Sequence, residues 1–256
     1  MKKHGFTLAE VLITLGIIGV VAALTAPALV QNAGSAQIGP KLAKAVSTFE
    51  IANENLLTTE GSNSLASISA TPGPSATSIE NYVDSLSNYM KISYYDESSS
   101  SEKYETLLAN YDGSKFTFIS GGGLQAALYS IHTLFAKKNL AISKDGVLYG
   151  IGKAGTSTVS QTPQKSPFGI VLIDVNGITK PNRLGKDVFA FLLMQDGSLR
   201  PVGSSSWAST ALGDDTLNTM YNWKTGTSDK CNETSVTSGW TCAGSIYENN
   251  QKVIYQ

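Results

Sequence analysis

The sequence is poor in charged residues, in histidine and in cysteine. Charged side chains make up 15% of the 256 residues, below the roughly 25% of an average soluble domain, and 31 serines and 23 threonines stand in their place. The 19 lysines and arginines nearly balance 20 acidic residues, so no basic surplus exists to bind a nucleic acid. The two histidines and two cysteines argue against zinc clusters and histidine-rich metal sites.

Motifs of common enzyme classes are also missing. The chain contains no G-x-S-x-G nucleophile elbow, no P-loop and no H-E-x-x-H zinc motif. We interpret His132 as a packed or surface residue, and the serine runs beginning at Ser98 and Ser204 as loops. The sequence therefore predicts no catalytic residue and no enzymatic activity.

What the chain does have is a long apolar run at its amino terminus, residues 6–30. As an α-helix this run would be about 37 Å long, enough to cross a hydrocarbon core of roughly 30 Å with some tilt. Lys2 and Lys3 precede it, which predicts a cytoplasmic amino terminus. Its non-apolar side chains are Thr7, Glu10, Thr14 and Thr25.

Glu10 distinguishes this run from ordinary membrane segments. A carboxylate in an apolar segment costs about 2.5 to 3.5 kcal/mol on insertion scales, and a signal peptide would carry it inside its hydrophobic region. Three interpretations compete: an uncleaved anchor, a signal peptide cleaved near Ala26 to Ala28, and a more specialised helix in which Glu10 finds a partner.

The segment Gly5-Phe6-Thr7-Leu8-Ala9-Glu10, after a short basic leader and before Val11-Leu12-Ile13-Thr14-Leu15, resembles the class III signal of type IV pilins and type II secretion pseudopilins. This resemblance implies cleavage by the prepilin peptidase between Gly5 and Phe6, and N-methylation of Phe6. It also implies assembly into a filament through the apolar helix. Glu10 would meet the amino terminus of a neighbouring subunit at Phe6, and this pair would fix the stagger between subunits.

Three further residues of the apolar run, Gly16, Gly19 and Pro27, are similar in spacing to the family's helix-weakening positions. Proline removes a helix hydrogen bond, so Pro27 predicts a kink or a locally looser helix. The alternative is that glycine and proline are simply common in membrane helices.

Beyond the apolar run, the sequence predicts one head on one stalk. We divide the chain into a leader (1–5), a transmembrane and assembly helix (6–30), an amphipathic continuation (31–60) and a periplasmic or extracellular α+β head (61–256). Gly39-Pro40 predicts a bend in the continuation. Its apolar residues recur at alternating spacings of four and three on one helix face: Ile38, Leu42, Ala45, Phe49, Ala52 and Leu56.

Within the head, Asp-Gly and Asn-Gly pairs mark β-hairpins, and a short helix is expected over 79–90. A further helix over 124–135 is expected to cross the sheet. The predicted fold class is α+β and pilin-like, with a long N-terminal helix packed on an antiparallel β-sheet head. The expected strands are 115–120, 140–143, 147–151, 169–174, 188–194 and 199–202.

The two cysteines, Cys231 and Cys242, enclose ten residues near the carboxyl end. A disulfide is the economical interpretation, because a head outside the cytoplasm meets oxidising conditions and closing so short a loop stabilises by roughly 3 kcal/mol. The loop also resembles the disulfide-bounded region of many type IV pilins. Two free buried thiols are the alternative.

Asp174, Asn176 and Asp187 place oxygen atoms around one tight connection. Calcium takes six to eight oxygen ligands, and some pseudopilins bind it, so a calcium site is one interpretation. The stretch lacks the EF-hand spacing, and Asp and Asn also favour turns without any ion. Calcium is the one cofactor that the sequence raises.

Taken together, the residues favour a structural filament subunit. Its implied partners are the prepilin peptidase, other pilin or pseudopilin subunits and an inner-membrane assembly platform. It would be a single-pass inner-membrane protein, then part of a periplasmic or cell-surface filament. A pilus, a secretion pseudopilus and a DNA-uptake fibre all fit the motif, and the size of the head favours a minor subunit. The alternative is a Sec-exported or membrane-anchored binding module with no filament role.

Overall fold

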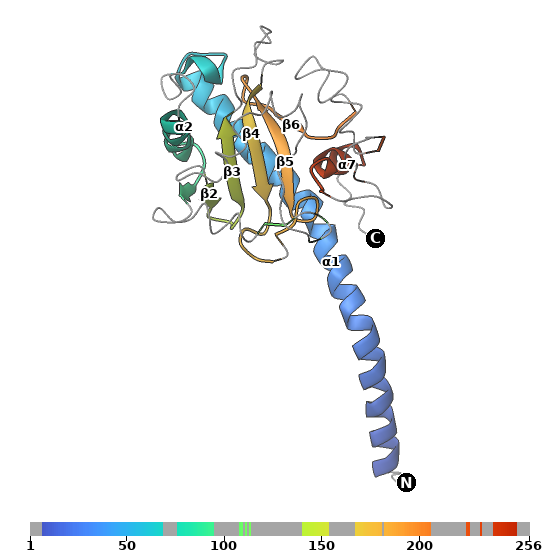
Figure 1. Ribbon diagram of the computed structural model, residues 1–256. Coiled ribbons are helices and arrows are strands. Elements are labelled where there is room, and N and C mark those ends of the chain that lie inside the picture. Colours follow the sequence, from blue (N-terminus) through green and yellow to red (C-terminus); the bar gives the residue numbers. More distant parts are fainter. Residues whose placement is uncertain are drawn as a thin grey trace.

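Figure 1 shows the computed structural model, a long helix that leaves a compact head at one end. The structure describes residues 7–68, 76–94, 108–109, 111, 113, 140–153, 167–180, 182–205, 224–225, 231 and 238–249. Gly5 and Phe6, the predicted strand 115–120, the predicted helix 124–135 and His132 lie outside these residues, as do the side chains of 26–36.

The dominant element is α1, one helix from Leu8 to Thr59 with 52 residues. It ends as predicted, with Glu60 at the C-cap and Gly61 in the left-handed region at φ 64°. The helix continues through Gly39-Pro40, so the expected bend does not interrupt it. Leu42 and Phe49 are fully buried just beyond Pro40, and this burial offsets the hydrogen bond that the proline removes.

The head is built on one six-stranded antiparallel sheet with the strand order β1-β2-β3-β4-β5-β6. Its strands are β1 (Ile92–Tyr94), β2 (Leu140–Ser143), β3 (Leu148–Lys153), β4 (Pro167–Asp174), β5 (Val188–Met194) and β6 (Leu199–Pro201). Five of the predicted strands are confirmed to within two residues at each end. The structure adds β1, which the sequence did not predict.

β4 and β5 are buried on both faces. β5 (VFAFLLM) is buried along its whole length, and β4 (PFGIVLID) is buried from its second residue onward. Such continuous apolar runs, without polar alternation, are typical of strands covered on both sides. α1 crosses one face of the sheet (Figure 1), and α7 (Cys242–Glu248) also contacts β5.

Aromatic contacts join the helices to the sheet. Phe49 of α1 stacks on Tyr149 of β3 with ring centroids 5.5 Å apart. Tyr82 of α2 (Ala76–Ser87) meets Phe168 of β4 edge to face at 5.4 Å. A short 3-10 turn, η1 (Leu65–Ser67), follows α1 and buries Leu65. The predicted amphipathic stripe of α1 is therefore confirmed as the helix side of the core.

Two contacts with α1 show which end of the sheet lies nearer to the apolar stem. At one end, the Lys44 ammonium contacts the Asp145 carboxylate in the β2–β3 turn at 2.8 Å. At the other end, the Asn53 side chain donates to the Gly197 carbonyl in the β5–β6 turn at 3.1 Å. Since Lys44 precedes Asn53 on α1, the β2–β3 turn lies toward the apolar stem and the β5–β6 turn lies away from it (Figure 1).

Candidate functional site

The first turn of α1 is closed by a reciprocal pair of hydrogen bonds between Thr7 and Glu10. The Thr7 side-chain oxygen accepts from the Glu10 backbone N–H at 3.3 Å. Glu10 Oε2 accepts from the Thr7 backbone N–H and from the Thr7 hydroxyl, both at 2.8 Å. This capping box satisfies backbone donors that a helix start leaves unpaired. The Thr-x-x-Glu spacing is a signal for it that the sequence-based prediction overlooked.

The apolar segment of α1 that follows is Leu8–Thr25. Its mean hydropathy is 2.3 over 18 residues and none of it is buried within the chain. Large side chains on every side of the helix are exposed, for example Leu12 at 61% and Leu24 at 75%. A helix that is apolar on all sides requires a lipid or protein environment, so this surface must be covered by lipid or by another protein chain.

The polar side chains of the segment turn their hydroxyls back onto the helix. Thr14 donates to the Glu10 and Val11 carbonyls at 3.0 Å, and Thr25 donates to the Val21 carbonyl at 2.9 Å. Such bonds satisfy the hydroxyl within the helix and lower the cost of placing threonine in an apolar medium. Glu10 is then the charged group of this segment.

The glycines of this segment have no packing role inside the chain. A Cβ added at Gly16 or Gly19 would meet no atom within 4 Å. A glycine in a helix interior costs up to about 1 kcal/mol relative to alanine, so neither residue is explained by the fold of the isolated chain. α1 runs without a break through Pro27 as well. The helix-weakening role expected for the three residues stays a prediction.

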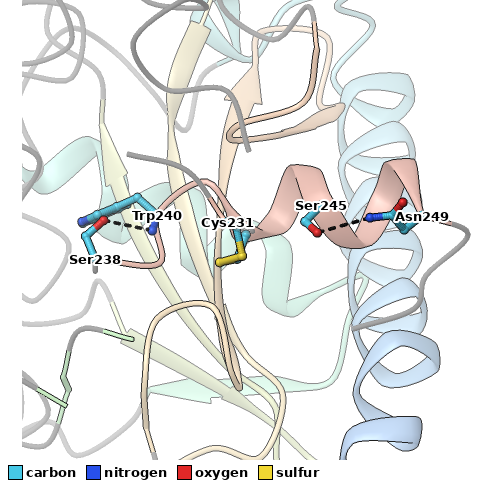
Figure 2. Close-up of a disulfide and its surroundings, with 6 residues drawn as sticks. Cys231, Ser238, Trp240, Ser245 and Asn249 are labelled. Carbon is cyan, nitrogen blue, oxygen red and sulfur yellow. Dashed lines mark hydrogen bonds between the residues drawn. A yellow bond between two sulfur atoms is a disulfide. The ribbon is translucent and has the colours of Figure 1, made fainter. Parts of the chain in front are cut away.

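The predicted Cys231–Cys242 disulfide is present in the structure. The two Cα atoms are 4.9 Å apart, and Cys242 opens α7 with its side chain fully buried. Figure 2 shows the bond together with its surroundings, where the Trp240 backbone N–H donates to the Ser238 hydroxyl at 3.4 Å. The indole of Trp240 is also buried. The disulfide thus closes a loop within the carboxyl-terminal segment, and α7 makes the contacts of this segment with β5 and β6.

Two glycines let this segment approach the sheet closely. A Cβ at Gly185 would lie 2.6 Å from Cys242 Sγ, and a Cβ at Gly244 would overlap the backbone of Gly203 and Ser204. A side chain at either position would force α7, which begins at Cys242, away from its present contacts with the head. Neither close approach could be predicted from the sequence, because both contacts join segments that are far apart in the chain.

The corner between β4 and β5 brings together the three residues of the calcium prediction. Asp174 accepts from the Asn176 backbone N–H and from the Asn182 side chain, both at 3.1 Å. Asp187 accepts from the backbone N–H groups of Asn182 at 2.8 Å and Arg183 at 2.6 Å. Burial raises the pKa of the Asp187 carboxyl, and these N–H donors oppose the rise.

Other oxygens of this corner lack such donors. Within the described residues, the side-chain oxygens of Asn176 and Asn182 are buried without a hydrogen-bond partner. The same residues include no group of three acidic, histidine or cysteine side chains able to hold a metal. A cation here would depend on amide and carbonyl oxygens as well as the two carboxylates. Calcium binding stays a prediction.

Comparisons with known proteins bear on the amino terminus. No curated protein and no solved structure matches the chain. A comparison with protein families matches residues 1–26 to the prokaryotic N-terminal methylation motif. This match covers both the expected processing positions, Gly5 and Phe6, and the capping box at Thr7 and Glu10. Together with the exposed apolar helix, it indicates a single-pass protein anchored in a membrane. The chain thus carries the signature of the type IV pilins and pseudopilins, the structural pilin-type proteins that are substrates of prepilin peptidase.

Proposed function

We propose that this chain is a structural, minor subunit of a type IV pilus-like filament or a type II secretion pseudopilus. The observation that carries the proposal is the apolar segment of α1, which is wholly exposed in the single chain although it is continuous with a helix buried in the head. Such a surface needs lipid before assembly and other subunits after it. The inner-membrane assembly platform would transfer it from the first environment to the second.

Processing prepares the helix for this exchange. Cleavage between Gly5 and Phe6 removes Lys2 and Lys3 and leaves a new amine one residue before Thr7. In the single chain, Glu10 satisfies the backbone of its own first turn. In a filament, the same carboxylate would meet the Phe6 amine of a neighbouring subunit. Because an unpaired charge in an apolar bundle costs several kcal/mol, this pairing would fix the stagger.

Mass spectrometry of the mature amino terminus tests the processing step. We expect cleavage after Gly5, leaving 251 of the 256 residues with an N-methylated Phe6. A terminus near Leu29 would instead indicate ordinary signal peptidase and a secreted binding module, and would contradict the proposal.

Replacing Glu10 tests the assembly step separately. Glu10→Val should insert and be cleaved normally, because removing a charge lowers the cost of membrane transfer. Its recruitment into sheared filament fractions should fall strongly, because the amine of the neighbouring subunit then lacks a partner. Thr14→Val is the matched control, since it removes a polar group from the same segment without changing the charge. Equal incorporation of both variants would show that the charge pair does not set the stagger.

We also propose that the β4–β5 corner binds calcium, and the two buried amide oxygens without hydrogen-bond partners favour this second proposal. The ligands would be Asp174, Asn176 and Asp187, completed by carbonyls and water. Calcium at a hundredfold excess over Kd should stabilise the full chain by about 2.7 kcal/mol, and Asp174→Ala should abolish the gain. Superimposable melts of the wild type in chelator and in millimolar calcium would leave a hydrogen-bonded turn.

A further inference from the structure

The end of the head from which the apolar stem leaves is formed by two adjacent turns. The β2–β3 turn is held to α1 by the Lys44–Asp145 ion pair. The β4–β5 connection packs on that turn, because a Cβ at Gly177 would lie only 2.6 Å from the Gly146 carbonyl oxygen. Strand pairing agrees, since Leu148 at the start of β3 lies opposite Asp174 at the end of β4. We call this surface the stem end of the head.

Exposed lysines gather at the stem end. Lys41 and Lys44 lie on α1 where it enters the head, and Lys144 and Lys180 lie in the two turns. Lys91 joins them, because its carbonyl accepts from the Lys144 backbone N–H at 3.2 Å. All five side chains are exposed. The stem end is therefore rich in cations although the whole chain has a net charge of −1.

The described carboxylates of the stem end do not balance these lysines. Asp145 pairs with Lys44. Asp174 and Asp187 are almost completely buried and accept hydrogen bonds inside the β4–β5 corner. Farther along α1, Glu54 and Glu60 are exposed instead. Among the residues that the structure describes, charge is thus separated along the axis of the head, with the lysines directed toward the stem.

An exposed apolar side chain lies among the lysines. Ile178, in the β4–β5 connection, is 48% exposed and is two residues from Lys180. The other large exposed hydrophobic residues of the described chain are Ile51 and those of the apolar stem. An apolar tip flanked by lysines is the combination that binds at a membrane surface, where the apolar group enters the interface and the cations meet phosphates.

We propose that the stem end docks on the anionic lipid headgroups of the bilayer that α1 spans, with Ile178 in the interface and Lys144 and Lys180 on the phosphates. This inference rests on the membrane anchor of the proposed function, which directs the stem end toward the bilayer. About 16 Å of helix separates Val30, where the apolar run ends, from Lys41. The headgroup layer is about 5 to 8 Å thick, and a tilt of up to about 40° brings one side of the head down to it.

Docking would hold the unassembled subunit against the membrane in one orientation. Extraction into a filament would then have to release the lysines from the lipid phosphates as well as the apolar stem from the hydrocarbon. The attraction is electrostatic and acts within a Debye length of about 8 Å in physiological salt. It should therefore depend on both lipid charge and ionic strength.

The test places a fluorescent probe at each end of the head in the full chain, reconstituted in vesicles with a spin-labelled headgroup lipid as quencher. Thr179→Cys marks the stem end and Thr59→Cys marks the opposite end; both threonines are exposed. The native cysteines are held in the disulfide. With phosphatidylglycerol present, the probe at residue 179 should be quenched and the probe at residue 59 should not. Quenching should be lost in phosphatidylcholine alone or in high salt.

Charge reversal provides the matched control. Lys180→Glu should lower the docking equilibrium constant at least fivefold, as expected for losing one cation near an anionic surface. Arg200→Glu changes the net charge equally on the exposed part of β6 and should leave quenching unchanged.

The outcomes separate docking from the membrane anchor. Release of the chain by alkaline carbonate would contradict both. An inserted chain with equal quenching at the two probe positions, or with the same quenching in neutral lipid, would contradict docking alone. Excimer formation between pyrene probes at residue 179 would place a second copy of the chain on this surface instead of lipid, and would also overturn the proposal.

Discussion

The two halves of α1 have the same backbone structure and opposite surroundings. Leu12 in the stem is 61% exposed, whereas Leu42 in the head half is fully buried, and one uninterrupted helix joins them. The stem is apolar on all sides, but the head half buries one apolar stripe and is mostly polar elsewhere, where Ile51 is an exposed apolar residue. Backbone hydrogen bonding therefore does not tell the halves apart. The pattern of apolar residues does, because it determines whether a helix can be covered by its own chain.

The two halves of α1 are therefore stabilised by different surroundings. The head half is stabilised by burial against the sheet, so its contacts belong to the unfolding free energy of the single chain. The stem gains nothing from the head and depends on lipid or on other subunits. Substitutions in the head half should therefore be measured by melting of the head. Substitutions in the stem should be measured by membrane insertion or filament assembly.

The largest expected effect comes from deleting an aromatic side chain on the head half. Phe49 is fully buried and stacks on Tyr149, so Phe49→Ala should cost about 3 to 5 kcal/mol of unfolding free energy. Leu12→Ala, on the exposed stem, should leave the unfolding of the head unchanged. Chemical denaturation of the detergent-solubilised chain measures both. Equal destabilisation by the two substitutions would show that the stem folds back onto the head.

The disulfide sharpens the comparison, because it acts on the head alone. Cys231→Ser should lower the unfolding free energy of the head by roughly 3 kcal/mol through the freed loop. It should leave membrane insertion of α1 unchanged. Thermal melts and carbonate extraction of the same variant give the two readouts. Cys231 is the better site for the substitution, since Cys242 is buried and a serine there would add an unpaired hydroxyl.

A smaller effect is expected from removing one buried hydroxyl. The Tyr82 hydroxyl donates to the Asn53 side-chain oxygen at 2.6 Å, and both residues are fully buried. Tyr82→Phe should cost about 1 to 3 kcal/mol, because it leaves that oxygen buried without a partner. Thr14→Val removes a hydroxyl hydrogen bond from the stem and should not change the unfolding of the head. Similar losses in both variants would contradict the division between the halves.

The same tyrosine gives a pH dependence. Burial raises the pKa of Tyr82. The unfolded chain releases this proton near pH 10, whereas the folded chain retains it. The stabilisation is therefore fully present below about pH 10 and is lost as the pH rises further. Tyr82→Phe should flatten this alkaline loss, which melts at increasing pH would measure.

Features set by neighbouring residues were predicted well from the sequence. The Asp145-Gly146 and Asp196-Gly197 turns lie where expected, since each glycine supplies the positive φ that the turn requires. β4 and β5 were also predicted, because each is a continuous run of apolar residues within one element. β1 was missed because a three-residue strand has little signal of its own. It is a strand because it pairs with β2, whose residues follow almost fifty positions later.

The sequence by itself determined the amino-terminal motif, the apolar stem, the stripe of α1 and most strands. Each of these depends on residue type and on spacing within a single element. The tertiary structure alone decided that Asn53 meets Tyr82 and Gly197, that Gly244 lies against Gly203, and that lysines from α1 and two turns gather at the stem end. These contacts join residues distant in the chain, and their formation depends on how the sheet packs on the helix.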